Sequence, residues 1–181
     1  MVNDFLYWNS VELIKAYKAK DISPVEVIKA SLENAHRSNE KFNFITEFLE
    51  EIAIKNAKIS EEIYLGIGNA SPRTLEGIPL AVRDEFALKG THRTSGSKIY
   101  KNRKDDYTDV YVSRLLNGGS IPIFKTTTPE FCLLGTTWSD LHGITKNPWN
   151  EKFTPGGSSG GSGVALATGS ATIATGSDIG G

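Results

Sequence analysis

The sequence predicts an α/β fold with a mostly parallel sheet, because short apolar runs alternate with segments of helical periodicity. Residues 77–82 and 121–125 have the length and apolar character of buried strands, and residues 172–175 form a third such run. Amphipathic segments precede and separate these runs. The length of 181 residues suits one domain with a sizeable buried core.

The N-terminal third is expected to be mainly helical. Residues 10–20 carry apolar side chains at helical spacing, with Ser10 as the N-cap. In the run SPVEV, Ser23 can cap a helix, Pro24 suits its first position and Glu26 completes a capping box. The helix that starts there is predicted to end near residue 38. A strand at 42–48 and a helix at 50–63 follow, and the side chains expected to face inward from the two helices are Val27, Ile28, Leu32, Ala35, Ile52, Ala53, Ala57 and Ile63.

The rest of the chain alternates strands with helices. The strand at 77–82 ends abruptly in Arg83-Asp84-Glu85, and charges at the end of a buried strand often build a site in α/β folds. The later elements are expected, in chain order, as a helix at 109–117, a strand at 121–125, a helix near 160–167 and a strand at 172–175.

Composition excludes several classes of function. Lys plus Arg is 20 and Asp plus Glu is 21, so the formal net charge is −1 and gives no basic field for nucleic acid or anionic membrane. No apolar run approaches the roughly 20 residues that span a bilayer, and the N-terminus lacks a signal-peptide pattern, so we expect a cytoplasmic protein. The single Cys132 and three widely spaced histidines predict neither disulfides nor a metal site.

Glycine is concentrated at the end of the sequence, where 9 of the 18 glycines fall within residues 156–181. The same segment contains apolar runs, which favour burial in a core. This indicates a site rather than a flexible linker. A phosphate-binding loop would need a lysine that GGSSGGS lacks. The pattern G-x-S-x-G also fits the nucleophile elbow of an α/β-hydrolase, but that enzyme needs a histidine after the serine, and all three histidines precede it.

A third interpretation comes from a longer pattern. The run TPGGSSGGSGVALATGSATIATGSDIGG closely resembles the glycine- and serine-rich signature of the amidase signature family. The segments GIPLAVRDEF, NGGSIPIFKTTTPEF and LHGITKNPWN resemble three further motifs of that family, in the same order. The resemblance implies a mixed β-sheet sandwiched between α-helices. It also implies that residues 1–181 are the N-terminal part of a single amidase-signature domain, with a helical region at 1–63 and the start of the core at 77–181.

Members of this family hydrolyse carboxamides with a serine–cis-serine–lysine triad, through an acyl-enzyme and without a cofactor. Ser158 matches the cis-serine, so the Gly157–Ser158 peptide bond is expected to be cis. Ser159 matches a neighbouring serine that supports the site by hydrogen bonding, whereas Ser162 is interpreted as a residue of the helix N-terminus.

The resemblance also assigns an oxyanion hole to the backbone N–H groups of Ile179, Gly180 and Gly181. Consecutive glycines suit this role, because their N–H groups can converge on one point without interference from Cβ atoms. Asp178 would orient the same loop.

Two departures from the family pattern stand out. The nucleophilic serine is expected at position 182, so we expect the remainder of the chain beyond 181 to complete the site. Arg83 stands where the family has its catalytic lysine, and an arginine stays protonated and cannot act as the base. Arg83 could still donate hydrogen bonds to Ser158, and Lys89 and Lys125 are alternative bases by their presence alone.

These features leave three functions open. The first is an amidohydrolase that acts on a small-molecule or peptide amide. This class includes the glutaminase subunit of a transamidosome, and it is compatible with a homodimer. The second, favoured by Arg83, is a catalytically silent amide- or partner-binding protein, and the third is another serine hydrolase with a histidine base. In isolation, the 181 residues are expected to expose apolar faces at 121–124 and 172–175 and to aggregate.

Overall fold

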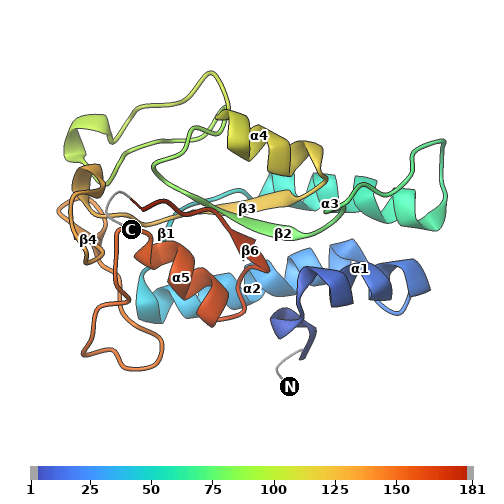
Figure 1. Cartoon of the computed structure of the whole chain (residues 1–181), viewed down its shortest axis with the longest axis horizontal. Helices are drawn as coiled ribbons and strands as arrows, with labels where there is room; N and C mark the ends of the chain where they lie inside the picture. The colour runs from blue at the N-terminus through green and yellow to red at the C-terminus, as the bar shows by residue number, and fades with distance from the viewer. Residues whose placement is uncertain (1–3, 179–181) are drawn as a thin grey trace.

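The computed structural model describes residues 4–178, which form a mixed β-sheet with helices on both faces (Figure 1). The helices are α1 (Ser10–Ala19), α2 (Pro24–Phe42), α3 (Glu50–Leu65), α4 (Val110–Asn117) and α5 (Gly160–Ala167), with short 3-10 turns at Asp4–Tyr7, Lys98–Tyr100 and Glu130–Cys132. The strands of the main sheet are β1 (Ile45–Phe48), β2 (Pro79–Arg83), β3 (Ile121–Thr126) and β6 (Ile173–Ala174). A small separate hairpin pairs β4 (Trp138–Ser139) with β5 (Gly143–Ile144).

The main sheet has the strand order β1-β3-β2-β6. Strands β3, β2 and β6 run parallel, whereas β1 pairs with β3 in the antiparallel sense. The sheet is therefore mixed, as the family resemblance predicted, and its parallel part is the portion that the alternation of strands and helices predicted. The carboxyl ends of the three parallel strands meet at one edge, which is where α/β folds place their sites.

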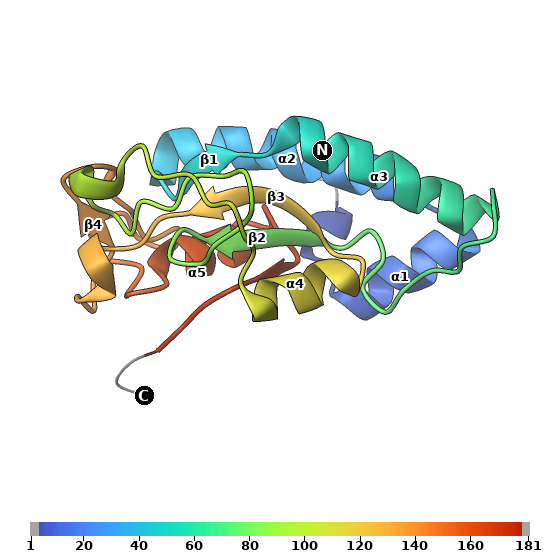
Figure 2. The same ribbon diagram turned by 90° about the horizontal axis from the view of Figure 1, so that it is seen from above.

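Apolar layers cover both faces of this sheet. Helices α2 and α5 pack on one face and α4 on the other, as seen from the side and from above (Figures 1 and 2). The inward positions predicted for α2 are all buried, and so are Ala53 and Ala57 of α3. Ile52 is half exposed and Ile63 only partly buried, so the prediction for these two was wrong: the buried face of α3 is a narrow one made of small residues.

Local capping explains where the first helices begin. Ser23 and Glu26 form the predicted capping box at the start of α2. For α1 the prediction was wrong by one residue, because Asn9 is the N-cap: its side chain accepts from the N–H groups of Val11 and Glu12. Helix α2 also continues to Phe42, four residues past the predicted end, so β1 starts later than predicted.

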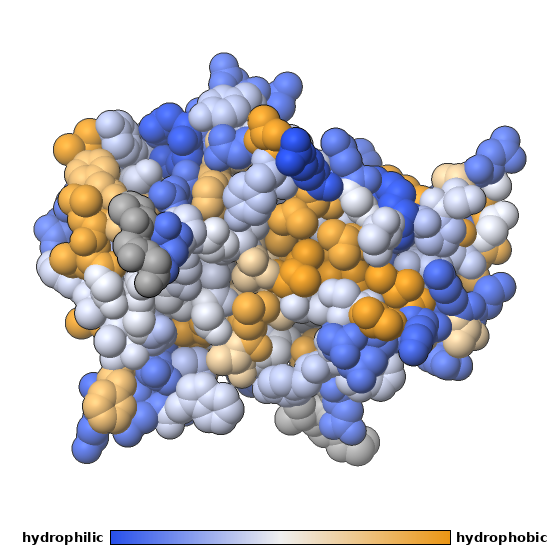
Figure 3. Space-filling model, in the orientation of Figure 1, coloured by the Kyte–Doolittle hydropathy of each residue, from blue (hydrophilic) through white to orange (hydrophobic). Residues whose placement is uncertain are grey.

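Strand β3 is not exposed to solvent. Residues 121–124 are fully buried, because β3 lies between β1 and β2 and under helices on both sides, so their predicted exposure was wrong. Strand β6, in contrast, is a half-buried edge strand. Figure 3 shows the molecule from the same side as Figure 1, with apolar side chains gathered across its middle. In Figure 1 this is where β6 and β2 lie, between α4 and α1.

The N-terminal segment is tied to the end of α5. The backbone carbonyl of Thr168 accepts a hydrogen bond from the Tyr7 hydroxyl at 3.3 Å and one from the Asn34 amide at 2.8 Å. Asn34 lies on α2 and is buried, so these bonds join residues more than 130 positions apart along the chain. Among the helices of residues 4–178, none is both long and apolar enough to cross a bilayer.

Candidate functional site

The carboxyl ends of the parallel strands bring two charged side chains and several hydroxyl groups together. Arg83 is the last residue of β2, and its side chain is completely buried. Its neighbour in register on β3 is Thr126, the last residue of that strand. The loop after β3, the glycine-rich loop before α5 and the loop after β6 all reach Arg83. We refer to the residues that meet there as the hydroxyl cluster: Arg83, Glu85, Thr128, Ser158, Ser159 and Ser177.

Arg83 is the centre of the hydroxyl cluster. Its Nη1 atom donates to Ser159 Oγ at 3.0 Å and to Ser177 Oγ, and its Nη2 atom donates to Thr128 Oγ1 at 2.9 Å. The same Nη1 atom lies 2.9 Å from Glu85 Oε2, which makes an ion pair. The planar guanidinium therefore links three loops that are far apart in the sequence, a role to which its fixed fork of donors is suited.

Ser158 joins the cluster through its backbone. The Gly157–Ser158 peptide bond is cis, so the geometry expected from the resemblance is present. Thr128 Oγ1 donates to the Ser158 carbonyl at 3.1 Å. Within the described residues, the Arg83 guanidinium reaches Ser159 and not Ser158, so Thr128 is the residue that bridges Arg83 to Ser158.

Ser159 connects the glycine-rich loop to the loop after β6. Its Oγ accepts from the Ser177 N–H at 3.1 Å and donates to the Ser177 carbonyl at 3.2 Å. Asp178 follows and is exposed. The residues predicted to form the oxyanion hole, Ile179, Gly180 and Gly181, lie outside the described residues.

Ser162 lies in the first turn of α5, where the sequence predicted it. Its buried hydroxyl is 2.8 Å from Thr126 Oγ1 and donates to the Thr175 carbonyl at 2.8 Å. Ser162 therefore fastens α5 to the ends of β3 and β6, next to the hydroxyl cluster.

The two lysines considered as alternative bases lie elsewhere. Lys125 is one residue before Thr126 on β3, so its side chain points to the opposite face of the sheet, where its Nζ donates to the Phe86 carbonyl at 2.8 Å. Burial there lowers the pKa of Lys125, although Asp84 and other acidic side chains on that face oppose the shift. Lys89 is exposed. Neither lysine belongs to the hydroxyl cluster. The geometry therefore supports neither of them as a base in place of the family's lysine.

The lowered pKa of Lys125 has a measurable consequence. The folded chain releases this proton at a lower pH than the unfolded chain, whose lysines titrate near pH ~10.4. Between these values the unfolded state binds more protons, so stability contributed by this residue rises with pH. We expect the Lys125→Met variant to lack this rise when urea denaturation is measured between about pH 8 and pH 10.

The exposed Lys89 provides the matched control for that experiment. Lys89→Met should follow the unaltered protein, and comparing the two variants removes the contribution of buried tyrosines such as Tyr17 and Tyr64, whose pKa burial raises in the folded chain. Equal pH dependence in the Lys125→Met and Lys89→Met variants would show that the buried amine does not contribute.

The opposite face of the sheet holds a second buried polar group around Asp84. Its carboxylate accepts from the Thr94 N–H and hydroxyl and from the Gly96 N–H, at 2.8–3.3 Å. The Thr94 hydroxyl also lies 3.0 Å from His142 Nε2, and burial lowers the pKa of that histidine. Asp84 thus anchors the loop that starts at Thr94, and Phe131 donates its N–H to Ser95 of this loop.

Reasoning from the sequence gave no role in the site to Thr128, Ser177 or Cys132, and it noted Glu85 only as one of three charged residues at the end of a strand. The Cys132 thiol lies 3.3 Å from Thr128 Oγ1, and burial raises its pKa. The positions of Glu85 and Thr128 did carry a signal in the sequence, because each residue follows the last residue of a parallel strand by two positions. Polar residues at that spacing from neighbouring strands meet at the same sheet edge.

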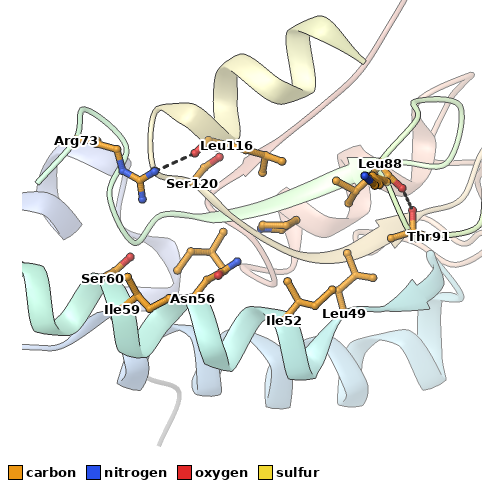
Figure 4. Close-up of a pocket in the computed structure, with 14 residues that line it drawn as sticks. Leu49, Ile52, Asn56, Ile59, Ser60, Arg73, Leu88, Thr91, Leu116 and Ser120 are labelled. Carbon is orange, nitrogen blue, oxygen red and sulfur yellow. Dashed lines mark hydrogen bonds between the residues drawn. The ribbon is translucent and has the colours of Figure 1, made fainter. Parts of the chain in front are cut away.

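A cavity of about 310 Å³ lies away from the hydroxyl cluster, between α3 and the segment around α4 (Figure 4). Leu49, Ile52 and Ile59 of the α3 side and Leu116 of α4 line it, with Arg73 at one end (Figure 4). In the part of the chain that the structure describes, no group of three or more His, Cys, Asp or Glu side chains is arranged to hold a metal ion.

Comparison with known proteins gives a consistent result. The family model "Amidase" matches residues 26–181. The chain is 37% identical over 179 residues to a glutamyl-tRNA(Gln) amidotransferase subunit from Agathobacter rectalis, covering 98% of this chain and 35% of that protein. It is 40% identical over 171 residues to the subunit of the same name from Nitrosococcus oceani, covering 94% and 35%. The chain thus spans about a third of the length of the curated relatives it matches.

Two solved structures share the fold of this chain. A structure named fatty acid amide hydrolase matches with a TM-score of 0.91 and 27% identity, over 98% of this chain and 31% of that one. A 6-aminohexanoate cyclic dimer hydrolase complexed with substrate matches with a TM-score of 0.83 and 27% identity, over 93% and 33%.

Proposed function

The chain belongs to the amidase signature family, and we propose that at its natural length it is an amidohydrolase that cleaves a carboxamide through an acyl-enzyme. The observation that supports this activity is the convergence of Arg83, Thr128, Ser159 and Ser177 beside Ser158, at the carboxyl ends of three parallel strands. Acyl transfer by serine needs such a preorganised hydrogen-bonding site more than it needs a cofactor.

The roles follow from the family pattern. The nucleophile is the serine expected at position 182, and Ser158 in the cis-serine position relays its proton. The N–H groups of Ile179, Gly180 and Gly181 bind the developing oxyanion, and one such donor is typically worth about 3–4 kcal/mol of barrier. Ser159 supports this arrangement by holding the loop after β6 through Ser177.

The substrate and partners are part of the proposal. The substrate is a small-molecule or peptide amide, and glutamine belongs in the test set because the curated relatives are amidotransferase subunits. We propose that residues 1–181 contribute the N-terminal part of a single domain that the remainder of the chain completes. A homodimer and a cytoplasmic location fit the same proposal, which involves no nucleic acid and no membrane.

A second candidate is a catalytically silent amide-binding or partner-binding protein on the same fold. Arg83 is the observation that favours it, because the family's base at this position is a lysine and a guanidinium holds its proton. In that case restoring the lysine with Arg83→Lys should raise hydrolysis by at least about 100-fold, the usual contribution of a general base.

Two measurements test the proposed function. The intact mass of the natural polypeptide establishes whether it carries the serine expected at position 182. Ammonia release is then measured with glutamine, a fatty primary amide and a peptide amide. We expect hydrolysis of at least one of these, and a loss of about 100-fold or more in Ser158→Ala.

The exposed Ser71 offers a matched control, since Ser71→Ala should leave the rate unchanged. Absence of hydrolysis by both the unaltered protein and Arg83→Lys would overturn the proposed activity. Hydrolysis by Arg83→Lys alone would establish the silent protein.

A further inference from the structure

The cavity between α3 and the segment around α4 has two ends of different character (Figure 4). Leu49 and Leu88 lie toward one end of it, whereas Arg73 and Ser120 lie toward the other. Ile52 of α3 also lines the cavity and is half exposed, so its apolar surface faces the cavity rather than the core. A cavity of about 310 Å³ with this division has room for a small molecule that carries an apolar tail and a polar head.

The hydroxyl of Ser120, at the polar end, is buried and unpaired. Ser120 is only 5% exposed, and within the described part of the chain its Oγ atom has no hydrogen-bond partner. Its backbone N–H donates to the Leu115 carbonyl at 3.2 Å, which fixes the residue in the wall of the cavity. Most buried hydroxyl groups are bonded, so this one indicates a place for a ligand group that accepts its proton.

Two further donors line the cavity near Ser120. Asn56 comes from α3, on the opposite wall, and its side-chain amide makes no hydrogen bond within the described residues (Figure 4). Arg73 donates to Glu76 through Nε at 2.6 Å and through Nη2 at 2.9 Å. Its Nη1 atom makes only one long hydrogen bond, of 3.5 Å, to the Leu116 carbonyl. A hydroxyl, a carboxamide and a guanidinium N–H are therefore available at the polar end.

The charges around the cavity favour an anion. Arg73 and Lys89 are the charged residues in its lining, and both are basic. The buried Glu76 neutralises Arg73, whereas the exposed Lys89 belongs to no ion pair within the described residues. A carboxylate accepts hydrogen bonds through two oxygens, and its bonds are stronger than those of a neutral acceptor. The polar end therefore suits a carboxylate head.

We propose that this cavity is a second binding site, which takes a medium-chain aliphatic carboxylate. The carboxylate accepts from Ser120, Asn56 and Arg73, and the alkyl chain lies along Ile52 toward Leu49. Burial of the alkyl chain supplies most of the affinity, and the head group fixes the orientation. The inference does not depend on the proposed amide hydrolysis, because none of these residues belongs to the hydroxyl cluster.

The test measures binding of octanoate to the natural polypeptide by isothermal titration calorimetry. Octanoate is expected to bind with a Kd below about 1 mM, and octan-1-ol, which lacks the charge, at least about tenfold more weakly. Ser120→Ala should weaken octanoate binding by about tenfold or more, because a hydrogen bond to a charged group is lost. The same variant should keep the unfolding midpoint of the unaltered protein when octanoate is absent, since the hydroxyl has no partner to lose.

Ser113 of α4 provides the matched control, because it does not line the cavity and Ser113→Ala should leave the affinity unchanged. Loss of octanoate binding in Ser158→Ala but not in Ser120→Ala would place the carboxylate in the hydroxyl cluster and overturn the inference. Equal affinity for octanoate and octan-1-ol would contradict the carboxylate head. Absence of octanoate binding to the unaltered protein would also overturn the inference, and would mean that water or the remainder of the chain fills the cavity.

Discussion

Replacing Asp84 by alanine is expected to lower the free energy of unfolding by about 3–5 kcal/mol, because the buried Thr94 N–H loses its acceptor and the Gly96 N–H and the Thr94 hydroxyl each lose a hydrogen bond to a buried carboxylate. Each buried donor left unpaired costs about 1–3 kcal/mol, and a typical domain has only about 5–15 kcal/mol in total. Urea denaturation of the protein at its natural length measures the change.

Two further variants make this result specific. Asp84→Asn keeps one acceptor oxygen and should lose clearly less stability than Asp84→Ala. The exposed Asp106 serves as the matched control, since Asp106→Ala should change stability by no more than about 0.5 kcal/mol. A loss below about 1 kcal/mol in Asp84→Ala would mean that the Thr94 loop finds other partners.

The second large effect is expected at Gly161, where α5 lies directly on the end of β3. A methyl group there would lie 2.5 Å from the backbone nitrogen of Thr127 and 2.7 Å from its carbonyl oxygen. Backbone atoms cannot rotate away, so Gly161→Ala is expected to cost about 3 kcal/mol, at the upper end of the usual range for overpacking. Thermal or urea denaturation reports this loss.

Gly163 is a matched control on the same helix. Nothing lies within 4 Å of a methyl group at Gly163, and the residue is exposed. Alanine forms helices better than glycine, so Gly163→Ala should stabilise the protein by up to about 1 kcal/mol. Similar effects of the two substitutions would contradict the close packing of α5 on Thr127.

Much of the fold could be predicted because its signals are local. The capping box at Ser23 and Glu26, the apolar run of β2 and the boundaries of α5 depend on neighbouring residues in the sequence. The antiparallel β1 and the burial of β3 depend on contacts between distant segments, which periodicity does not encode. For the same reason Ile52 was expected in the core, although it lines the cavity beside α3 and is half exposed.

The candidate site divides in the same way. Ser158, Ser159 and Arg83 could be found because they stand in long motifs that resemble one family. Two other partners of Arg83 could not be found in this way, because Thr128 and Ser177 are 45 and 94 positions away from it along the chain. Their role depends on which strands are neighbours, and that order became visible only with the sheet.

The carbonyl of Thr168 has a consequence for how this protein folds as a unit. It receives hydrogen bonds from both the N-terminal 3-10 turn and α2, and it ends the helix that begins directly after Ser159. A movement that carries α5 along with the glycine-rich loop would therefore break bonds to the N-terminal segment and to α2. We regard the two ends of the described chain as one cooperative folding unit, in which the helices that carry no chemistry stabilise the loop that does.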